Sequence, residues 1–138
     1  MSYLSELYNG TAANAGLFAP VTDVMRFMRL MLNRGQISGE RRFYDESAVD
    51  KFTSRVSGLK YNNSRALGFD TVPLEADRPC GNKFGPNSYG VFGETGTMAW
   101  ADRDKDIAIV ILTNSANGSG RQRCKAHFGK ISDAVMTA

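Results

Sequence analysis

The sequence predicts a single α+β domain in which an antiparallel sheet of about three C-terminal strands packs with helices. Three observations predict this class: a helical apolar period over residues 21–32, three strand-like apolar segments between residues 89 and 114, and a second helical pattern after residue 120. The chain has 138 residues, the usual size of one domain, so we expect residues 1–138 to share one core.

The first helix is expected from Val21 to Leu32. Pro20 suits the start of a helix, and Gly35 suits a left-handed stop just after its end. We interpret the methionines of this segment as core residues, although a Met-rich face is also typical of adaptable binding surfaces. The apolar residues recur at the spacing of one helix face and are Val21, Val24, Met25, Met28, Met31 and Leu32.

Short elements joined by loops are expected over residues 36–90. Gln36 to Phe43 carries two turns and predicts a hairpin, after which Asp45 is placed to cap a short helix ending near Phe52. The next segment is rich in Gly, Pro, Asn and Ser, so we predict loops around a single short strand at 67–72. The expected inner face of the short helix consists of Ala48, Val49 and Phe52.

The last third of the chain is the most regular. The polar turn Asp102–Asp106 is tight enough to make the second and third of its strands antiparallel neighbours. Apolar residues fill successive positions of the third strand, so we expect both of its faces to be covered. The three strands are predicted at Tyr89–Glu94, Thr97–Asp102 and Ile107–Asn114. A helix beginning at Ser119 or Gly120 follows, and its expected inward residues are Cys124, Phe128, Ile131, Ala134 and Val135.

Composition and charge exclude several classes of function. Hydrophobic residues make up 42% and charged residues 22%, and the longest apolar run is only Ile107 to Leu112, so neither a bilayer span nor wholesale disorder is expected. The net charge of +3 is too small to indicate nucleic acid binding by itself. We therefore predict neither a nucleic acid nor a membrane partner. Basic residues do gather near the C-terminus, a pattern typical of a solvated helix face or of a phosphate-binding one: Arg121, Arg123, Lys125, His127 and Lys130.

Cysteine and histidine usage predicts no metal site. Cys80 and Cys124 match no metal-ligand spacing, and there is one histidine, so we predict neither a metal nor another cofactor. The two thiols would be free in a reducing compartment and could pair in an oxidising one. The N-terminal residues lack a basic segment followed by an apolar core, so no secretory signal is predicted in this chain and the cytoplasm is the default location.

Two segments, taken in chain order, carry a family resemblance. The first is Asn14-Ala-Gly-Leu-Phe-Ala-Pro-Val, which leads into the first helix. The second is Phe92-Gly-Glu-Thr-Gly96, followed by Trp100 and by Asp106-Ile-Ala-Ile-Val-Ile-Leu-Thr-Asn114. The pattern resembles the C-terminal part of the serine β-lactamase and penicillin-binding-protein-like hydrolases, in the branch of class C β-lactamases and esterases. The resemblance runs from about Asn14 to about Ala134.

This resemblance implies a partial β-lactamase or transpeptidase-like fold and a parent reaction. That reaction is ester or amide hydrolysis, of a β-lactam or an ester, through an acyl-serine intermediate. The resemblance also implies that a strand carrying Glu94, Thr95 and Gly96 lines the substrate site, so these three are the predicted substrate-binding residues. The family's Ser-x-x-Lys and Tyr-x-Asn elements lie upstream of the matched region. We therefore expect a fragment or truncated homologue with no catalytic residue, inactive alone.

One Ser-x-x-Lys sequence does occur in this chain, at Ser57-Gly-Leu-Lys60, and Tyr61-Asn-Asn63 follows it directly. The family places these motifs on separate elements that folding brings together, whereas here they are contiguous and include Gly58. We interpret this segment as a polar loop and do not assign Ser57 as a nucleophile.

Glu94 departs from the family pattern, which has Lys or His before Thr-Gly. A cation there would hold a substrate carboxylate through charge-assisted hydrogen bonds, whereas the Glu94 carboxylate would repel one. The resemblance, with this change, implies a neutral or cationic ester or amine ligand, or no ligand. The alternative interpretation of Glu94 is a solvent-facing strand residue. The distance from Gly96 to Trp100 is also shorter than the family usually has.

The resemblance further implies that strands present in the whole fold are missing beside Ile107–Asn114. That strand should then expose a hydrophobic edge, which is a template for pairing with another chain, so we expect self-association or a partner there. Two alternatives to a hydrolase fragment remain open. One is a non-catalytic binding or structural domain that retains the fold, and the other is a basic interaction module that works through the C-terminal helix.

Overall fold

The computed structural model describes residues 17–39, 41–58, 64–74, 78–114 and 120–138, with the backbone alone over residues 120–126. The helices of this part of the chain are α2 (Val21–Leu32), α3 (Glu46–Thr53) and α4 (Gly120–Val135). Its strands are β1 (Gln36–Ser38), β2 (Arg41–Arg42), β3 (Asp70–Thr71), β4 (Tyr89–Gly93), β5 (Thr97–Asp102) and β6 (Ile107–Ile111). The predicted α+β class is confirmed.

Four antiparallel strands form the main sheet, in the order β3-β4-β5-β6. The β4–β5 ladder runs from Tyr89 opposite Ala101 to Gly93 opposite Thr97, and β5 pairs with β6 along its length. The strand predicted at 67–72 is the fourth member of this sheet, because β3 pairs with the first two residues of β4. The predicted ends are wrong for two strands: β4 stops at Gly93 and β6 at Ile111.

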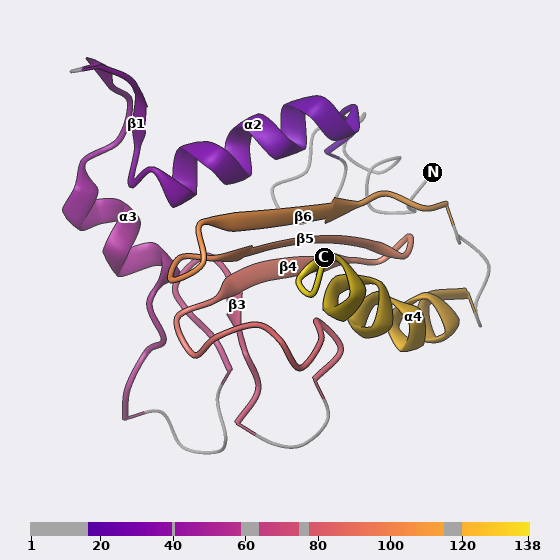
Figure 1. The fold of residues 1–138 in the computed structure, drawn as a ribbon. Helices are drawn as coiled ribbons and strands as arrows, with labels where there is room; N and C mark the ends of the chain where they lie inside the picture. The colour runs from indigo at the N-terminus through magenta and orange to yellow at the C-terminus, as the bar shows by residue number, and fades with distance from the viewer. Residues whose placement is uncertain (1–16, 40, 59–63, 75–77, 115–119) are drawn as a thin grey trace, which may run out of the picture.

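Helices cover both faces of the sheet, with α2 on one side and α4 on the other (Figure 1). On the α2 side the helix crosses β5 and β6, and on the α4 side the Phe128 ring packs toward the face that carries Trp100. The core on the α2 side consists of Met28, Met31, Val49, Tyr89, Ala99 and Ala101. The core on the α4 side consists of Val72, Cys80, Phe84, Met98, Trp100, Ile109 and Phe128.

Helix α2 has the predicted ends. Pro20 precedes its first turn, and the Pro20 carbonyl accepts hydrogen bonds from the N–H groups of Asp23 and Val24. Gly35 has a φ of +85°, and a Cβ there would lie 2.2 Å from the Tyr44 carbonyl oxygen, so this stop requires glycine. The predicted hairpin follows as β1 and β2. Met28 and Met31 are buried, which supports the core interpretation of the methionines.

The inward faces of the two later helices differ from prediction. In α3 Val49 is buried, but Ala48 and Phe52 are exposed, and Thr53 is the second buried residue. In α4 Phe128 and Ser132 are buried, whereas the predicted Ile131, Ala134 and Val135 are exposed. Among the described residues of each helix, the two buried positions are four apart, which places them on one face of the helix. The side chain of Cys124 lies outside the described residues.

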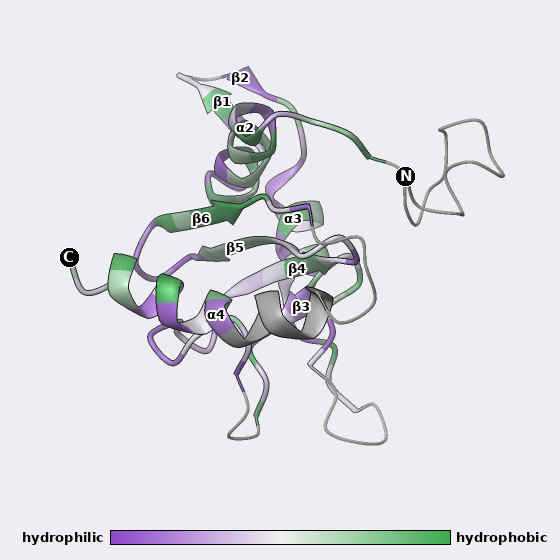
Figure 2. Cartoon of the chain, turned by 90° about the vertical axis from the view of Figure 1, so that its right-hand side faces the viewer, coloured by the Kyte–Doolittle hydropathy of each residue, from purple (hydrophilic) through white to green (hydrophobic). Residues whose placement is uncertain are grey.

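Strand β6 is also less covered than its composition predicts. Ile109 is buried, while the other four residues of the strand are half-buried. The reason is its place in the sheet: β6 is the last strand of the described order, so neighbouring strands shield it from one side only. Figure 2 shows this strand as an apolar ribbon lying between α2 and the rest of the sheet.

Candidate functional site

The predicted substrate-binding residues lie in the β4–β5 turn, not on a strand. Glu94, Thr95 and Gly96 form a three-residue connection between Gly93 and Thr97, which are paired. The N–H of Gly96 donates to the Gly93 carbonyl at 3.3 Å, and Gly96 has a φ of +78°. A turn closed by a left-handed glycine is a common three-residue hairpin loop, and it ends β4 before the motif.

This turn is tied to the end of β6 but leaves one side chain in solvent. The Thr113 hydroxyl donates to the Gly96 carbonyl and lies 3.4 Å from that of Thr95. Glu94 is exposed, Thr95 is half-buried and Gly96 is buried. Glu94 therefore faces solvent from a turn, which corrects the strand placement and keeps its carboxylate accessible to a ligand.

The β4 strand beside this turn is apolar. β3 ends opposite Tyr89 and Gly90, so it does not extend along the second half of β4. That second half is Val91–Gly93, which has no ionisable side chain, and Val91 is 46% exposed. Apart from the Glu94 carboxylate, the groups at this end of the sheet that could contact a ligand are backbone N–H and C=O groups, hydroxyl groups and apolar side chains.

The structure gives no support for Ser57, in the Ser57-Gly-Leu-Lys60 sequence, as a nucleophile. Ser57 is exposed and Gly58 has a φ of +78°, which is suited to a turn. Lys60 and Tyr61-Asn-Asn63 lie outside the described residues. Among the described residues, no hydrogen bond joins a serine hydroxyl to a lysine, histidine or tyrosine side chain. An activated serine needs such a neighbouring base.

The Cys80 side chain is completely buried, and its thiol has low reactivity. Burial raises the pKa of its thiol to about 12, so the reactive thiolate is scarce at neutral pH. Within the described part of the chain, no group of three or more His, Cys, Asp or Glu side chains is placed to hold a metal ion. Within that same part, no helix is both long enough and apolar enough to cross a bilayer.

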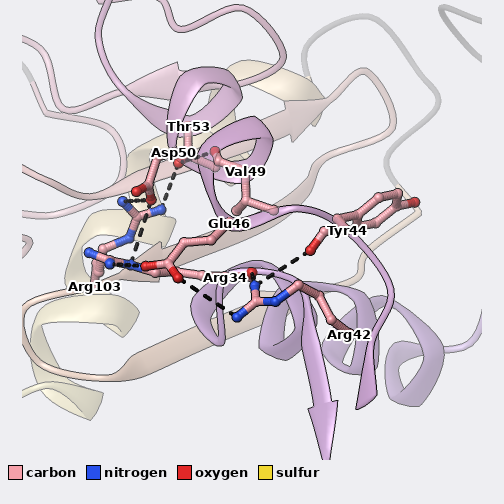
Figure 3. Close-up of polar contacts among 8 residues, drawn as sticks. All are labelled: Arg34, Arg42, Tyr44, Glu46, Val49, Asp50, Thr53 and Arg103. Atoms are coloured by element: carbon pink, nitrogen blue, oxygen red, sulfur yellow. Dashed lines mark hydrogen bonds and ion pairs between the residues drawn. The ribbon is translucent and has the colours of Figure 1, made fainter. Parts of the chain in front are cut away.

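Charged residues from α3, the end of α2 and the β5–β6 turn form one cluster (Figure 3). Arg103, which follows β5, lies 2.9 Å from the Asp50 carboxylate and donates to the Thr53 hydroxyl at 2.7 Å. Its guanidinium carbon also lies 5.5 Å from the centre of the Tyr89 ring. Burial raises the pKa of the Tyr89 phenol. These contacts fasten α3 to the sheet.

The outer half of the same cluster joins α2 to α3. Arg34 pairs with Glu46 at 2.5 Å, and Arg42 lies 3.7 Å from the same carboxylate. The hydrogen bond and charge of Arg34 lower the pKa of Glu46, and Glu46 in turn raises the pKa of Arg34. Each carboxylate in the cluster already has a basic partner, which indicates a structural role rather than a substrate site.

A buried carboxylate that the sequence did not single out for a role organises the opposite end of the sheet. Asp102 is completely buried and accepts hydrogen bonds from three backbone N–H groups: that of Gly85 at 2.8 Å, Asp104 at 3.0 Å and Lys105 at 3.1 Å. It therefore holds the loop before β4 against the β5–β6 turn. Nothing in the sequence indicated this role for the sixth and last residue of the expected strand, because the bond to Gly85 is set by the fold.

Only part of the C-terminal basic face belongs to the described residues. His127 and Lys130 are exposed on α4, as a solvated helix face requires. The side chains of Arg121, Arg123 and Lys125 lie outside the described residues. A solvated face and a phosphate-binding face predict the same exposure for these two residues.

The fold matches that of solved β-lactamases. A crystal structure of a β-lactamase from Mycobacterium bovis aligns with a TM-score of 0.66 and 23% sequence identity over 86% of this chain and 44% of its own. The sheet, the two layers of helices and the β4–β5 motif therefore define a β-lactamase-type α+β domain. The family model for β-lactamases matches residues 2–128, and the chain belongs to the β-lactamase family.

Curated relatives are longer proteins. Putative D-alanyl-D-alanine carboxypeptidases of Salmonella agona (strain SL483) and Salmonella newport (strain SL254) are 33% identical over 111 residues. The alignments cover 76% of this chain and 24% of those proteins. The chain thus spans about a quarter of the length of these curated relatives, which agrees with a resemblance to one part of the family's fold.

Proposed function

We propose that this chain is one part of a β-lactamase-family serine hydrolase and is inactive alone. The proposal rests on the contrast between the extent of the family match and the absence of an activated serine among the described residues. The family match covers nearly the whole chain, yet the described residues contain no serine hydroxyl hydrogen-bonded to a base. An acyl-serine mechanism requires that pair, which the described residues do not supply. We therefore place the nucleophile and the base in polypeptide outside this chain.

The parent reaction is hydrolysis of an ester or an amide. Membership in the β-lactamase family supports amide hydrolysis, and the name of the carboxypeptidase relatives refers to cleavage of a peptide amide. In such reactions an oxyanion develops on the substrate carbonyl and is stabilised by backbone N–H groups. The backbone near Thr95 and Gly96, at the exposed end of β4, is where we place the contribution of this chain.

Glu94 directs the choice of ligand toward neutral or cationic molecules. Its exposed carboxylate stands in the turn beside Thr95 and would repel a ligand carboxylate. We expect Glu94→Lys to strengthen binding of a small carboxylate relative to its methyl ester, measured by amide chemical shifts of residues 91–97. An unchanged preference in the variant would place the ligand elsewhere.

The edge of β6 is the proposed place where another polypeptide strand is added. Ile107–Ile111 has no charged side chain and no proline, and β5 is its only strand partner in the described sheet. With the chain alone in solution, that strand comes from a second copy. Sedimentation across a concentration series should show association, and amide exchange at 107–111 should quicken on dilution. A monodisperse monomer with rapid exchange along β6 would contradict this.

A non-catalytic binding domain is the second candidate, and Glu94 is the observation that favours it. This chain has the Glu94 carboxylate where the family has a Lys or His side chain, as expected if the fold has kept its core but lost its original ligand. Such a domain would bind an ester or amine ligand without turning it over. It would also bind without polypeptide from outside the chain.

Turnover by the isolated chain tests the proposal. The substrates are an uncharged p-nitrophenyl ester and a chromogenic β-lactam, with Ser57→Ala as the matched control. We expect no rate above that of the control for either substrate. Turnover that disappears in Ser57→Ala would mean that Ser57-Gly-Leu-Lys60 is a working nucleophile, and the chain would be a small hydrolase in its own right.

A further inference from the structure

We propose that a pocket beside β3 binds a small carboxylate that carries an apolar body. The pocket has a volume of about 180 Å³. Buried Val72 and Phe84 contribute to its wall, and the other lining residues include Pro73, Pro86 and the arginines Arg55 and Arg78. A concave apolar surface with a few convergent polar groups is the usual form of a small-molecule site.

Arg78 gives this pocket its charge preference. Arg55 donates a hydrogen bond to the carbonyl oxygen of Val72, which holds its guanidinium at the pocket wall. Arg78 is half-buried and takes part in no ion pair with the described residues. No acidic residue is among the described residues that line the pocket. A half-buried guanidinium without a carboxylate favours an anion, and its planar donors match a carboxylate.

The apolar wall limits the rest of the ligand. Val72 and Phe84 are 4% and 3% exposed, and the Phe84 ring packs against Trp100 with ring centres 5.7 Å apart. A cavity of roughly 150 Å³ accommodates a benzene ring, so this pocket is large enough for a small aromatic or branched aliphatic group. A bare inorganic anion would leave these walls unused.

The wall formed by residues 78–88 is fixed before any ligand arrives. Asp102 accepts the Gly85 N–H at 2.8 Å, and the Asp133 carboxylate accepts the Lys83 N–H at 2.8 Å. The Arg78 carbonyl accepts the Gly81 N–H at 2.9 Å, which sets the backbone at Arg78 itself. A preformed wall lowers the entropy that binding would otherwise cost.

This pocket is separate from the Glu94 turn. Val72 follows the residue paired with Tyr89, and Pro86 precedes Tyr89, so the pocket lies where β4 begins. The turn lies at the other end of β4, after Gly93. The two sites therefore differ in charge preference: the Glu94 turn repels a carboxylate, whereas this pocket favours one. Binding in the pocket does not depend on the proposed hydrolase function.

Benzoate titration of the intact chain tests the proposal, followed by amide chemical shifts and by calorimetry. We expect saturable binding of benzoate with amide shifts at Val72, Leu74, Phe84 and Gly85, and binding at least tenfold weaker for neutral benzamide and for inorganic phosphate. Arg78→Gln should weaken benzoate binding at least tenfold. Arg41→Gln, which removes an exposed arginine of β2, is the matched control and should leave it unchanged.

Three results would overturn the proposal. The first is equal binding of benzoate and benzamide, which would leave Arg78 without a role. The second is an equal loss in Arg78→Gln and Arg41→Gln, which would indicate general attraction to a basic chain. The third is benzoate binding that appears only after Glu75→Gln and Asp77→Asn, since one of the chain's own carboxylates would then hold the arginines.

Discussion

Replacing Asp102, the last residue of β5, by asparagine should destabilise the fold more than the same substitution at any aspartate of the β5–β6 turn. The carboxylate is completely buried and accepts the N–H groups of Gly85, Asp104 and Lys105 at 2.8, 3.0 and 3.1 Å. One oxygen, Oδ1, accepts from both Asp104 and Lys105, while Oδ2 accepts from the Gly85 N–H and lies 3.8 Å from the Lys105 ammonium nitrogen. Asparagine can keep the first pair through its carbonyl oxygen, but its amide NH₂ then faces the Gly85 N–H.

The size of the effect follows from these bonds. Loss of the Gly85 bond leaves a half-buried N–H without its acceptor, which costs about 1–3 kcal/mol. The two remaining bonds change from a charged to a neutral acceptor, which removes roughly another 1 kcal/mol in total. We therefore expect Asp102→Asn to lower the free energy of unfolding by about 2–4 kcal/mol. For a domain of this size that is a fall in Tm of about 7–14 °C.

Urea unfolding measures the loss, with Asp104→Asn as the matched control. Asp104 is exposed, and its carboxylate contacts the Asn87 side chain at 3.1 Å, so its variant should lose no more than about 0.5 kcal/mol. The slope of the free energy against urea should be equal in all three proteins, so that midpoints compare directly. A loss in Asp102→Asn as small as that of the control would refute the assigned role of Asp102.

Three other predictions concern the core and the charged cluster. Arg103→Met should cost about 1–2 kcal/mol in chemical denaturation, because the bond to Thr53 is lost, while the pair with Asp50, whose side chain is 37% exposed, adds little. Gly90→Ala should cost about 3 kcal/mol by the same assay, since the added Cβ would lie 2.4 Å from Trp100 Cγ, and a wild-type midpoint would contradict this packing. The Cys80 thiol should resist iodoacetamide at pH 8 in the folded chain and react once unfolded. Since its folded pKa of about 12 exceeds the ordinary 9.0, the stability it contributes is complete below about pH 9 and is lost as the pH rises toward 12. The urea midpoint of the wild type should thus fall more between pH 8 and pH 10.5 than that of Cys80→Ala.

Local signals in the sequence were enough to predict α2 and the ladder of the last strands. Pro20 and Gly35 bracket a helix whose methionines recur at helical spacing, and the observed ends agree with them. β5 has the predicted ends because polar turns flank it on both sides. These features depend on neighbours in the chain, which a sequence displays directly.

Features set by contacts distant in sequence could not be predicted in this way. Whether Phe52 or Thr53 is buried depends on Arg103, fifty residues later, which donates to the Thr53 hydroxyl. The placement of Glu94 in a turn depends on where β4 stops pairing with β5, and Gly96, with its positive φ, settles that point. The pocket at Arg55 and Arg78 brings together three separate segments, so no local pattern marks it.

Covalent labelling tests the central claim most directly, namely that this chain lacks the nucleophile of its family. The intact mass of the chain is measured after incubation with a serine-reactive phosphonylating probe, beside the Ser57→Ala variant. We predict the unmodified mass for both proteins. A single stoichiometric adduct on the wild type, whether or not Ser57→Ala removes it, would show that the chain carries its own activated serine and would contradict the account.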